Sequence, residues 1–490
     1  MLTLQITVSI LSAALLCGLG IKLVHIFQLE GYKPRNLLRW LLKRNPYFIT
    51  LVVVALLGAG SGFIIGFFAP GLFSFLGLLP YFAFGIFAIV LNLKKPAKIP
   101  LKYTARVKRL LGTIAIVADV VSFILLYFAP PKYLPITAAA LPVMMLVAIY
   151  IILPTEKLIG QIYLRRARKK LFSPEYKDLI RIGITGSYGK TTCKNILAEM
   201  LSKKYAVVAS PASFNTPMGF CRTVLGELKP DTQVLIMEMG ARKRGDIKQM
   251  CKLFKPQHGL LTSIGKCHLE TFKTEENIRA EKMELLNAVP NGGIKINGDI
   301  VPFMEFPRDF KTRLVGAHNR RNIMVCSEMA LELGVSQDQI RVAVAELKPT
   351  PHRLELIESP NGVRILDDSF NSSPHGAFAA LTVLADLKKS SPGASAIVIT
   401  PGMIELGASQ YDDNRRFGAQ MVGIADHVII VGETNKRAIY DGLHESPPET
   451  QFPESKIHFA KNLDEGKTIF GTLLKPGDIL LIENDLPDNF

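Results

Sequence analysis

The chain has 490 residues, of which 48% are hydrophobic, and its mean hydropathy of +0.24 is high for a purely soluble protein. Residues 1–177 hold 21 Lys and Arg against 4 Asp and Glu, whereas the remainder holds 37 against 38, so the net charge of +16 belongs to the first third. Binding to nucleic acid requires an excess of positive charge that neutralises phosphates. The remainder of the chain has a net charge of only −1 and therefore argues against a nucleic-acid-binding protein.

Five apolar runs in the first third are each long enough, at about 20 residues, to cross a hydrocarbon core. The first is not a cleaved signal peptide, because it lacks a basic start and a small-residue cleavage site, and four more runs follow it. The sequence thus predicts a multi-pass membrane domain over residues 1–155, with spans at Leu4–Phe27, Phe48–Ala69, Leu72–Leu93, Leu110–Ala129 and Leu134–Leu153.

The connections between these spans alternate in charge. Those after the first, third and fifth spans are rich in Lys and Arg, whereas the second is uncharged at Pro70-Gly71 and the fourth, at Pro130-Pro131, has only Lys132. The positive-inside rule places the N-terminus outside and everything after Leu153 in the cytoplasm, where ATP is available. Asp119 lies within the fourth span, where an acid is either functional or packed against Ser122 or a water-filled seam.

A basic linker is predicted over residues 156–177, followed by short β-rich runs that alternate with helical stretches. This alternation is typical of parallel sheets with crossover helices, and it predicts two α/β domains, at 178–348 and 349–490, divided near Pro349-Thr350-Pro351. The expected strands are Leu179–Thr185, Gln233–Glu238, Leu260–Ser263, Val363–Asp367, Ser395–Thr400, His427–Val431 and Ile479–Ile482. The expected helices include Lys190–Lys203, Glu275–Ala288, Arg320–Leu333, Pro374–Leu387 and Asn414–Ile424. Six cysteines without a CxxC pair favour reduced thiols in a cytosolic core.

The strongest single motif runs from Ile182 to Thr192, after an apolar strand and at the start of a helix. Its glycines let backbone N–H groups form a nest for phosphate oxygens, and the helix adds the positive end of its dipole. Lys190 is expected to reach the outer phosphates and the Thr191 hydroxyl to bind Mg²⁺. The motif departs from the strict phosphate loop, since position 184 is Ile, and by itself it leaves the reaction class open.

Three motifs downstream of the phosphate loop narrow the choice of reaction class. Glu238 ends an apolar strand, His268 follows another strand, and Glu281-Lys282 lies on a predicted helix. Taken singly these are a capped acid, a surface histidine and a solvated charge run. Taken together, and in this order, they resemble the Mur ligases, specifically the type that adds D-alanyl-D-alanine in peptidoglycan synthesis, over roughly residues 181–483. The resemblance also covers Asn215–Gly219, Gly316–Asn322, Arg353 in its HRLE stretch, Asp367–Pro374 and Gly402–Gly407.

This resemblance implies a role for each matching residue. The nucleotide would be bound by the phosphate loop and by residues on the adenine side and in the C-terminal domain: Thr185, Gly186, Ser187, Gly189, Lys190, Thr191, Thr192, Asn297, His318, Asn322, Asp368 and Asn371. Two Mg²⁺ ions are implied, with Thr191, Glu238, His268 and a carbamylated Lys282 as ligands. Catalytic roles fall on Lys190, Glu238, His268, Lys282 and Arg353.

The implied reaction is amide-bond formation through an acyl phosphate. A carboxylate attacks the γ-phosphate of ATP, while Mg²⁺ and Lys190 stabilise the spreading charge. Closure of the C-terminal domain, positioned by Arg353 and Asn371, would bring in the amine and exclude water. The implied partners are the bilayer, a cell-wall precursor and an amino acid or dipeptide.

The sequence departs from the family in three places. Membrane spans replace the N-terminal UDP-sugar domain, the stretch between Asn297 and His318 is short, and residues 481–489 lack the usual basic motif near the amine site. The first departure favours a carboxylate carried on a membrane lipid. Two alternatives stay open: a membrane-bound synthetase of the poly-γ-glutamate type, and an inactive scaffold that recruits cell-wall enzymes to the membrane.

Overall fold

The structure is a computed structural model of residues 1–490, and it describes all of them except 43–45, 69–70, 94–99, 266, 268, 301–305, 371, 405, 446, 448–450 and 486–490. The described residues form two compact units, 1–161 and 162–485. Two residues predicted for the site, His268 and Asn371, lie outside the described part of the chain.

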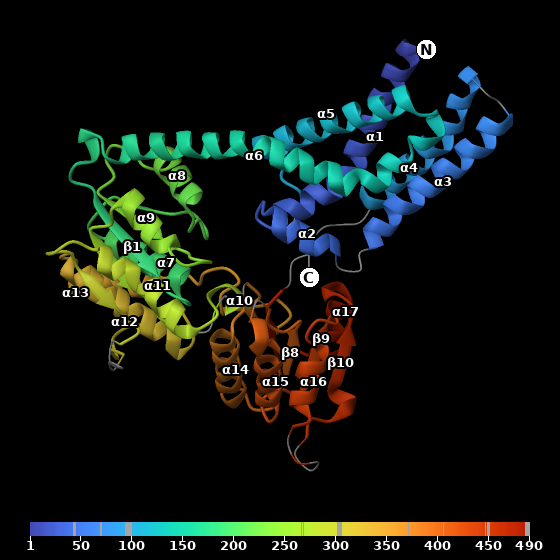
Figure 1. The fold of residues 1–490 in the computed structure, drawn as a ribbon. Coiled ribbons are helices and arrows are strands. Elements are labelled where there is room, and N and C mark those ends of the chain that lie inside the picture. Colours follow the sequence, from blue (N-terminus) through green and yellow to red (C-terminus); the bar gives the residue numbers. More distant parts are fainter. Residues whose placement is uncertain are drawn as a thin grey trace. The chain divides into compact units, whose positions relative to one another are not determined.

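The first unit is a bundle of long apolar helices, and each predicted span falls on one of them (Figure 1). Five of these helices are long and apolar enough to cross a membrane. The third run differs from a single α-helix, because it begins with a 3₁₀ turn, η1 (Gly71–Leu78), before α4. A short helix, α2, was not predicted. The α-helices of the unit are α1 (Leu2–Leu29), α2 (Pro34–Leu42), α3 (Pro46–Phe68), α4 (Leu79–Leu93), α5 (Ala105–Phe128) and α6 (Ile136–Leu171), and a 3₁₀ turn, η2 (Pro131–Tyr133), precedes α6.

Asp119 on α5 contacts α1 through a serine. Its Oδ1 accepts a hydrogen bond from Ser9 Oγ at 2.8 Å. The predicted neighbour Ser122 instead donates to Ser12 Oγ at 3.2 Å, one turn away. Gln5 Nε2 on α1 also donates to Leu126 O on α5 at 2.7 Å. Such contacts between polar groups hold helices together in an apolar environment.

The predicted linker 156–177 is largely helical, because α6 continues without interruption to Leu171. Two prolines, Pro142 and Pro154, lie within this helix. In the second unit its last turns bury Ala167 and Leu171 in an apolar cluster with helix α8, and Lys170 Nζ donates to Leu228 O at 2.7 Å. The last predicted span and the first residues of the second unit thus lie in one helix.

The first half of the second unit is a five-stranded parallel sheet in the order β2-β3-β1-β4-β5. Alternate residues of its strands enter two apolar clusters, so helices cover both faces. Its strands are β1 (Ile180–Thr185), β2 (Val207–Ala209), β3 (Val234–Glu238), β4 (His258–Leu261) and β5 (Lys295–Asn297). Its helices are α7 (Lys190–Ser202), α8 (Pro217–Gly226), α9 (Asp246–Phe254), α10 (Leu269–Phe272), α11 (Glu275–Ala288), α12 (Ala317–Glu332) and α13 (Gln337–Glu346), and the 3₁₀ turn η3 (Pro174–Tyr176) precedes β1.

The second half has a six-stranded sheet in the order β10-β9-β8-β11-β7-β6, parallel except for β6. Two apolar clusters again lie on its two faces. Its strands are β6 (Glu355–Glu358), β7 (Arg364–Asp368), β8 (Ala396–Thr400), β9 (His427–Val431), β10 (Ile457–Ala460) and β11 (Ile479–Glu483). Its helices are α14 (Pro374–Lys389), α15 (Gln410–Met421), α16 (Lys436–Leu443) and α17 (Leu463–Leu473), with 3₁₀ turns η4 (Gly407–Ser409) and η6 (Glu454–Lys456).

All seven predicted strands and all five predicted helices are present, with ends shifted by a few residues. Four strands were missed: β2, β5, β6 and β10. Each has only three or four residues and lies at or beside a sheet edge, so its own sequence carries too short a pattern to identify it.

Candidate active site

The phosphate loop connects the central strand β1 to helix α7. Thr185 ends the strand, and the loop turns through Gly186 and Gly189, whose φ angles are +152° and +75°. Lys190, the first residue of α7, donates from Nζ to the carbonyls of Gly186 at 2.9 Å and Ser187 at 3.0 Å. Burial lowers the pKa of this lysine, while the Glu238 carboxylate opposes that change. This geometry, at the N-terminus of a helix, fits the predicted phosphate cradle.

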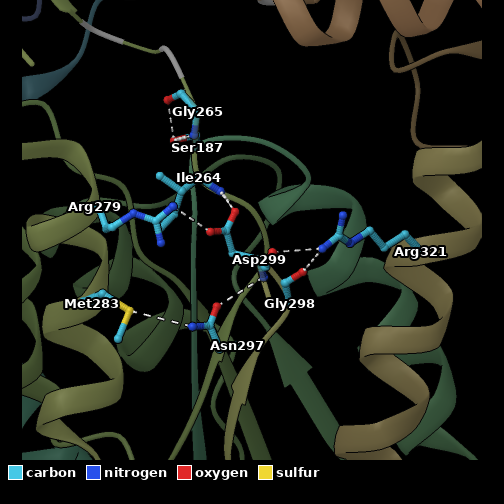
Figure 2. A network of polar contacts seen from close by, with 9 residues as sticks. All are labelled: Ser187, Ile264, Gly265, Arg279, Met283, Asn297, Gly298, Asp299 and Arg321. Carbon is cyan, nitrogen blue, oxygen red and sulfur yellow. Dashed lines mark hydrogen bonds and ion pairs between the residues drawn. The ribbon is translucent and has the colours of Figure 1, made fainter. Parts of the chain in front are cut away.

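The loop after β4 holds the phosphate loop from the side. Ser187 N donates to Ser263 O at 2.7 Å, and Ser187 Oγ exchanges hydrogen bonds with the backbone of Gly265 (Figure 2). The hydroxyl of Thr262 donates to the Tyr188 carbonyl. The backbone of the cradle is therefore fixed by hydrogen bonds to its neighbours.

Replacing Gly186 by alanine is expected to abolish nucleotide binding. An added Cβ would clash with the Thr262 hydroxyl and approach Ser263 N at 3.1 Å, and alanine disfavours this positive φ, so the loop would shift. Binding of a fluorescent ATP analogue measures the effect. Gly226→Ala is the matched control, since its added Cβ meets no atom within 4 Å and its binding should be unchanged. Wild-type affinity in the Gly186 variant would show that the loop does not hold the nucleotide.

The predicted metal acid lies beside the phosphate loop. Glu238 ends β3, the neighbour of β1, and its Oε2 accepts a hydrogen bond from Thr191 Oγ1 at 2.9 Å. Asn215 Nδ2 donates to the other oxygen at 3.1 Å. The glutamate is 1% exposed. A hydroxyl and a carboxylate in contact beside a phosphate cradle are the oxygen ligands that Mg²⁺ uses in nucleotide sites.

Lys194 is a buried cation that the sequence reasoning missed. It is 2% exposed, its Nζ lies 3.9 Å from Glu238 Oε2, and it donates to the carbonyl of Ala212. It therefore connects α7 to the loop that carries Asn215. Its position four residues after Lys190 places both lysines on one face of α7, and that spacing was the available signal.

Lys282 on α11 is 1% exposed, and its pKa is lowered to about 8, first by burial and then by the charge of Lys190. A lysine that readily loses its proton can react with CO₂, so the environment fits the predicted carbamate. The adjacent Glu281 has another role: its two oxygens accept N–H bonds from Gly245 at 2.6 Å and Ile247 at 2.7 Å, at the start of α9. No cluster of three or more metal-ligating side chains occurs among the described residues, to which His268 does not belong.

Two of the three residues predicted on the adenine side lie around the start of α12. His318 is half-buried, and its partial burial together with the charge of His375 lowers its pKa to about 4. Asn322 Oδ1 lies 3.0 Å from where a Cβ of Gly189 would be, so it packs against the phosphate loop.

The third, Asn297, belongs to a network around Asp299, which the sequence reasoning did not identify (Figure 2). Asp299 N donates to Asn297 Oδ1 at 3.2 Å. The Asp299 carboxylate accepts from Ile264 N at 2.9 Å and pairs with Arg279 at 3.0 Å. The end of the edge strand β5 is thereby tied to the loop that holds the phosphate cradle.

Arg353 lies in a strained loop of the C-terminal domain. Its neighbours His352 and Leu354 have φ angles of +61° and +50°, and non-glycine residues at positive φ are found disproportionately at functional sites. Asp367 Oδ2 bonds to His352 Nδ1 at 2.8 Å, and Asp368 Oδ1 accepts from Leu354 N at 2.9 Å. The two acids of β7 therefore hold the loop that presents Arg353.

Asp368 also lies beside a second buried acid. Burial is the main reason that its pKa is raised to about 6. Its register partner on β11 is Glu483, which is fully buried and accepts from Ser372 Oγ. Glu483 Oε2 has no hydrogen-bond partner in the described part of the chain, and burial raises its pKa well above the ordinary value. The sequence analysis noted that residues 481–489 lack the usual basic motif, but it did not predict that Glu483 is a buried acid beside Asp368.

Two comparisons with protein families and curated proteins agree with this geometry. Residues 184–305 match the Mur ligase middle domain, and residues 352–483 match the Mur ligase glutamate ligase domain, together more than half of the chain. The chain is 28% identical over 357 residues to a UDP-N-acetylmuramoyl-tripeptide–D-alanyl-D-alanine ligase of Mycobacterium tuberculosis, covering 62% of this chain and 69% of that protein. The ligase of the same description from Escherichia coli is 26% identical over 297 residues, covering 51% and 64%.

Solved structures show the same fold. MurF ligase from Thermotoga maritima in complex with ADP superposes with a TM-score of 0.54 at 24% identity, covering 66% of this chain and 80% of that one. MurF from Acinetobacter baumannii gives a TM-score of 0.55 at 22% identity, covering 66% and 76%. The chain belongs to the Mur ligase family, and it is an ATP-dependent ligase of the class that forms an amide bond and releases ADP and phosphate.

Proposed function

We propose that this protein is a membrane-anchored ligase that joins an amino acid or dipeptide to the carboxylate of a cell-wall precursor. The observation that carries the proposal is the contact of Thr191 with Glu238 beside the phosphate loop, with the buried Lys282 on the adjoining helix. The curated relatives act, by their names, on a muramoyl tripeptide and D-alanyl-D-alanine. These names supply the substrate class.

In the proposed first step, a carboxylate oxygen of the acyl substrate attacks the γ-phosphorus of ATP, and the bond to the β-phosphate oxygen breaks, releasing ADP. Lys190 neutralises charge that spreads over the phosphoryl oxygens. Thr191 and Glu238 would hold one Mg²⁺, and His268 with a carbamate on Lys282 a second, which together polarise the phosphoryl and carboxylate oxygens.

In the second step, the amine nitrogen attacks the acyl carbon of the acyl phosphate. The C–N bond forms, the bond to the phosphate oxygen breaks, and the amine loses a proton. Arg353 and Asn371 are proposed to position this step, because the acyl phosphate must be shielded from water until the amine arrives. Asp368 is proposed to contact the nucleotide. Adenine-side contacts are assigned to Asn297, His318 and Asn322.

We further propose that the first unit anchors the enzyme, with the N-terminus outside and the catalytic part in the cytoplasm. The five apolar helices and the alternating basic connections support this topology. A lipid-linked acyl substrate would then explain why apolar helices stand where the relatives have a sugar-binding domain.

Phosphate release from ATP tests the proposed reaction. Detergent-solubilised full-length protein is assayed with Mg²⁺, bicarbonate and UDP-linked or lipid-linked muropeptides, each with D-alanyl-D-alanine or single amino acids. Release that requires both an acyl substrate and an amine supports the ligase, and a preference for lipid-linked substrate supports the membrane role. If ATP binds but no pair stimulates turnover, the scaffold alternative replaces the proposal.

Topology is tested by labelling single cysteines in intact cells with a membrane-impermeant maleimide. Lys132→Cys, in the turn before α6, is expected to react from outside, whereas Lys177→Cys should react only after permeabilisation. Both single-cysteine variants are made in a protein in which the partly exposed Cys17 and Cys267 are replaced by serine, so that these two thiols do not react with the maleimide. Labelling of Lys177→Cys in intact cells would reverse the proposed orientation.

A further inference from the structure

The phosphate loop contains one aromatic residue, Tyr188, two positions before Lys190. Its backbone carbonyl accepts a hydrogen bond from the Thr262 hydroxyl in the loop after β4. Its ring lies directly on the backbone of that same loop, because a Cβ added to Gly265 would be only 2.6 Å from the ring atom Cε2. The middle domain therefore supports both the backbone and the ring of Tyr188.

The Tyr188 ring stacks on a histidine of the C-terminal domain. The ring centroids of Tyr188 and His375 are 5.6 Å apart and their planes are inclined by only 17°, a spacing at which aromatic rings attract one another beyond the area they bury. His375 is the second residue of α14. Ser373, the N-cap of that helix, hydrogen-bonds through its side chain to the Tyr188 hydroxyl. The first turn of α14 thus contacts the phosphate loop through a pair of rings, named here the Tyr188–His375 stack.

The contact between α14 and the phosphate loop accompanies a position of Arg353 close to the reacting groups. Burial is the main cause of the lowered pKa of Lys190, and the charge of Arg353 contributes to it. Burial also lowers the pKa of Arg353, and the carboxylates of Asp368 and Glu238 oppose that change. Arg353 is therefore within electrostatic reach of an acid of its own domain and of the lysine and the acid beside the phosphate loop.

A stack between two domains can be packing alone, but two features indicate a further role. The Tyr188 ring belongs to the loop proposed to hold the phosphates, so movement of α14 away from it would expose that loop to water. His375 is exposed, so its ring adds little to the apolar core of its own domain. The contrast is a second histidine stack, His427 on His458, at the amino end of β9 and away from the carboxyl ends at which ligands bind.

We propose that Tyr188 and His375 are positioning residues whose stack keeps the C-terminal domain closed on the phosphate loop while the acyl phosphate waits for the amine. The inference rests on the proposed function and assigns the exclusion of water to a contact in this chain. If water enters, its oxygen bonds to the acyl carbon and the bond from that carbon to the phosphate oxygen breaks. Carboxylate, phosphate and a proton are then released without an amide, so the stack determines how much ATP is used for each amide bond.

The test removes one ring at a time from the full-length protein. Tyr188→Leu and His375→Gln each break the stack, and His458→Gln, which breaks the other histidine stack of the same domain, is the matched control. Phosphate and amide are both measured with Mg²⁺, ATP and the acyl substrate, in the presence and absence of the amine. Because His375 is exposed, its variant should fold even if Tyr188→Leu does not.

Wild type and control should release phosphate and form amide in nearly equal amounts. Each stack variant should raise amine-independent phosphate release about three- to tenfold, the effect expected from the loss of one aromatic pair. The double variant should leak no more than the leakier single variant, because both substitutions remove the same contact. Unchanged release in both single variants, an equal increase in His458→Gln, or additive effects in the double variant would overturn the inference.

Dissociation of a fluorescent ADP, measured without acyl substrate or amine, separates this inference from the proposed reaction. A closed domain retains ADP in the loop, so both single variants should release it about three- to tenfold faster than wild type and His458→Gln do. If no substrate pair supports turnover but the variants release ADP faster, the reaction fails and the role of the stack in closure stands. If ADP leaves all four proteins at one rate, the inference fails whether or not ligation occurs.

Discussion

Replacing Lys190 by alanine is expected to reduce substrate-dependent phosphate release by about 10²- to 10³-fold, the usual effect of removing one preorganised charge-stabilising donor. The lysine is the first residue of α7, and its Nζ is held by the Gly186 and Ser187 carbonyls inside the loop. Lys194 cannot replace it, because that lysine is bonded to the Ala212 carbonyl and lies beside Glu238. The loss should appear in kcat, since the charge on the phosphoryl group increases in the transition state.

Lys229→Ala is the matched control, because Lys229 is an exposed lysine of the same domain. It should leave phosphate release within about twofold of wild type, as surface substitutions usually do. Thermal unfolding of both variants establishes that the domain is intact. Retention of more than a tenth of the wild-type rate by a folded Lys190 variant would exclude this lysine from the role assigned to it.

Replacing Lys282 by alanine is expected to reduce ligation by about 100-fold or more, the effect of removing a metal-orienting group. Small carboxylic acids such as formate should restore part of the activity, because they can supply the carboxylate that the carbamate would have supplied. Lys282→Arg fills the site with a permanent cation and should not be restored. Wild-type activity in the alanine variant, or equal effects of formate on both variants, would contradict the carbamate.

The pH dependence of this carbamate follows from the pKa of Lys282, which is lowered to about 8. Only the neutral amine reacts with CO₂. In metal-free protein, carbamate formation should therefore be small well below pH 8 and rise as the pH increases through that value. Carbon-13 NMR with labelled bicarbonate measures the carbamate directly, with Lys282→Arg as the blank. A signal that falls as the pH rises from 7 to 8.5 would contradict the assignment.

Much of this protein could be predicted from local sequence. The five apolar runs needed only length and hydropathy, and the strands β1 and β3 needed only short β-rich runs that end in Thr185 and Glu238. The contact between Thr191 and Glu238 followed from motif order, because parallel neighbours bring their carboxyl ends to one edge. These features depend on residues that are close in the chain or on a general rule of sheet geometry.

Other features depended on packing between distant segments. The burial that lowers the pKa of Lys282 comes from its surroundings in the folded domain. The hydrogen bonds from Gly245 N to Glu281 and from Ile264 N to Asp299 join residues that are 36 and 35 positions apart in the chain. The continuation of α6 through a segment predicted to be a linker is supported by burial of Ala167 and Leu171 against α8. Local patterns in the sequence were enough to identify the family and the order of the elements, and they predict which residues carry the phosphate chemistry. The burial of Lys194 and Lys282 and the binding of backbone N–H groups by Glu281 became visible only in the folded domain, because desolvation and hydrogen bonding arise from neighbours that are remote in the chain.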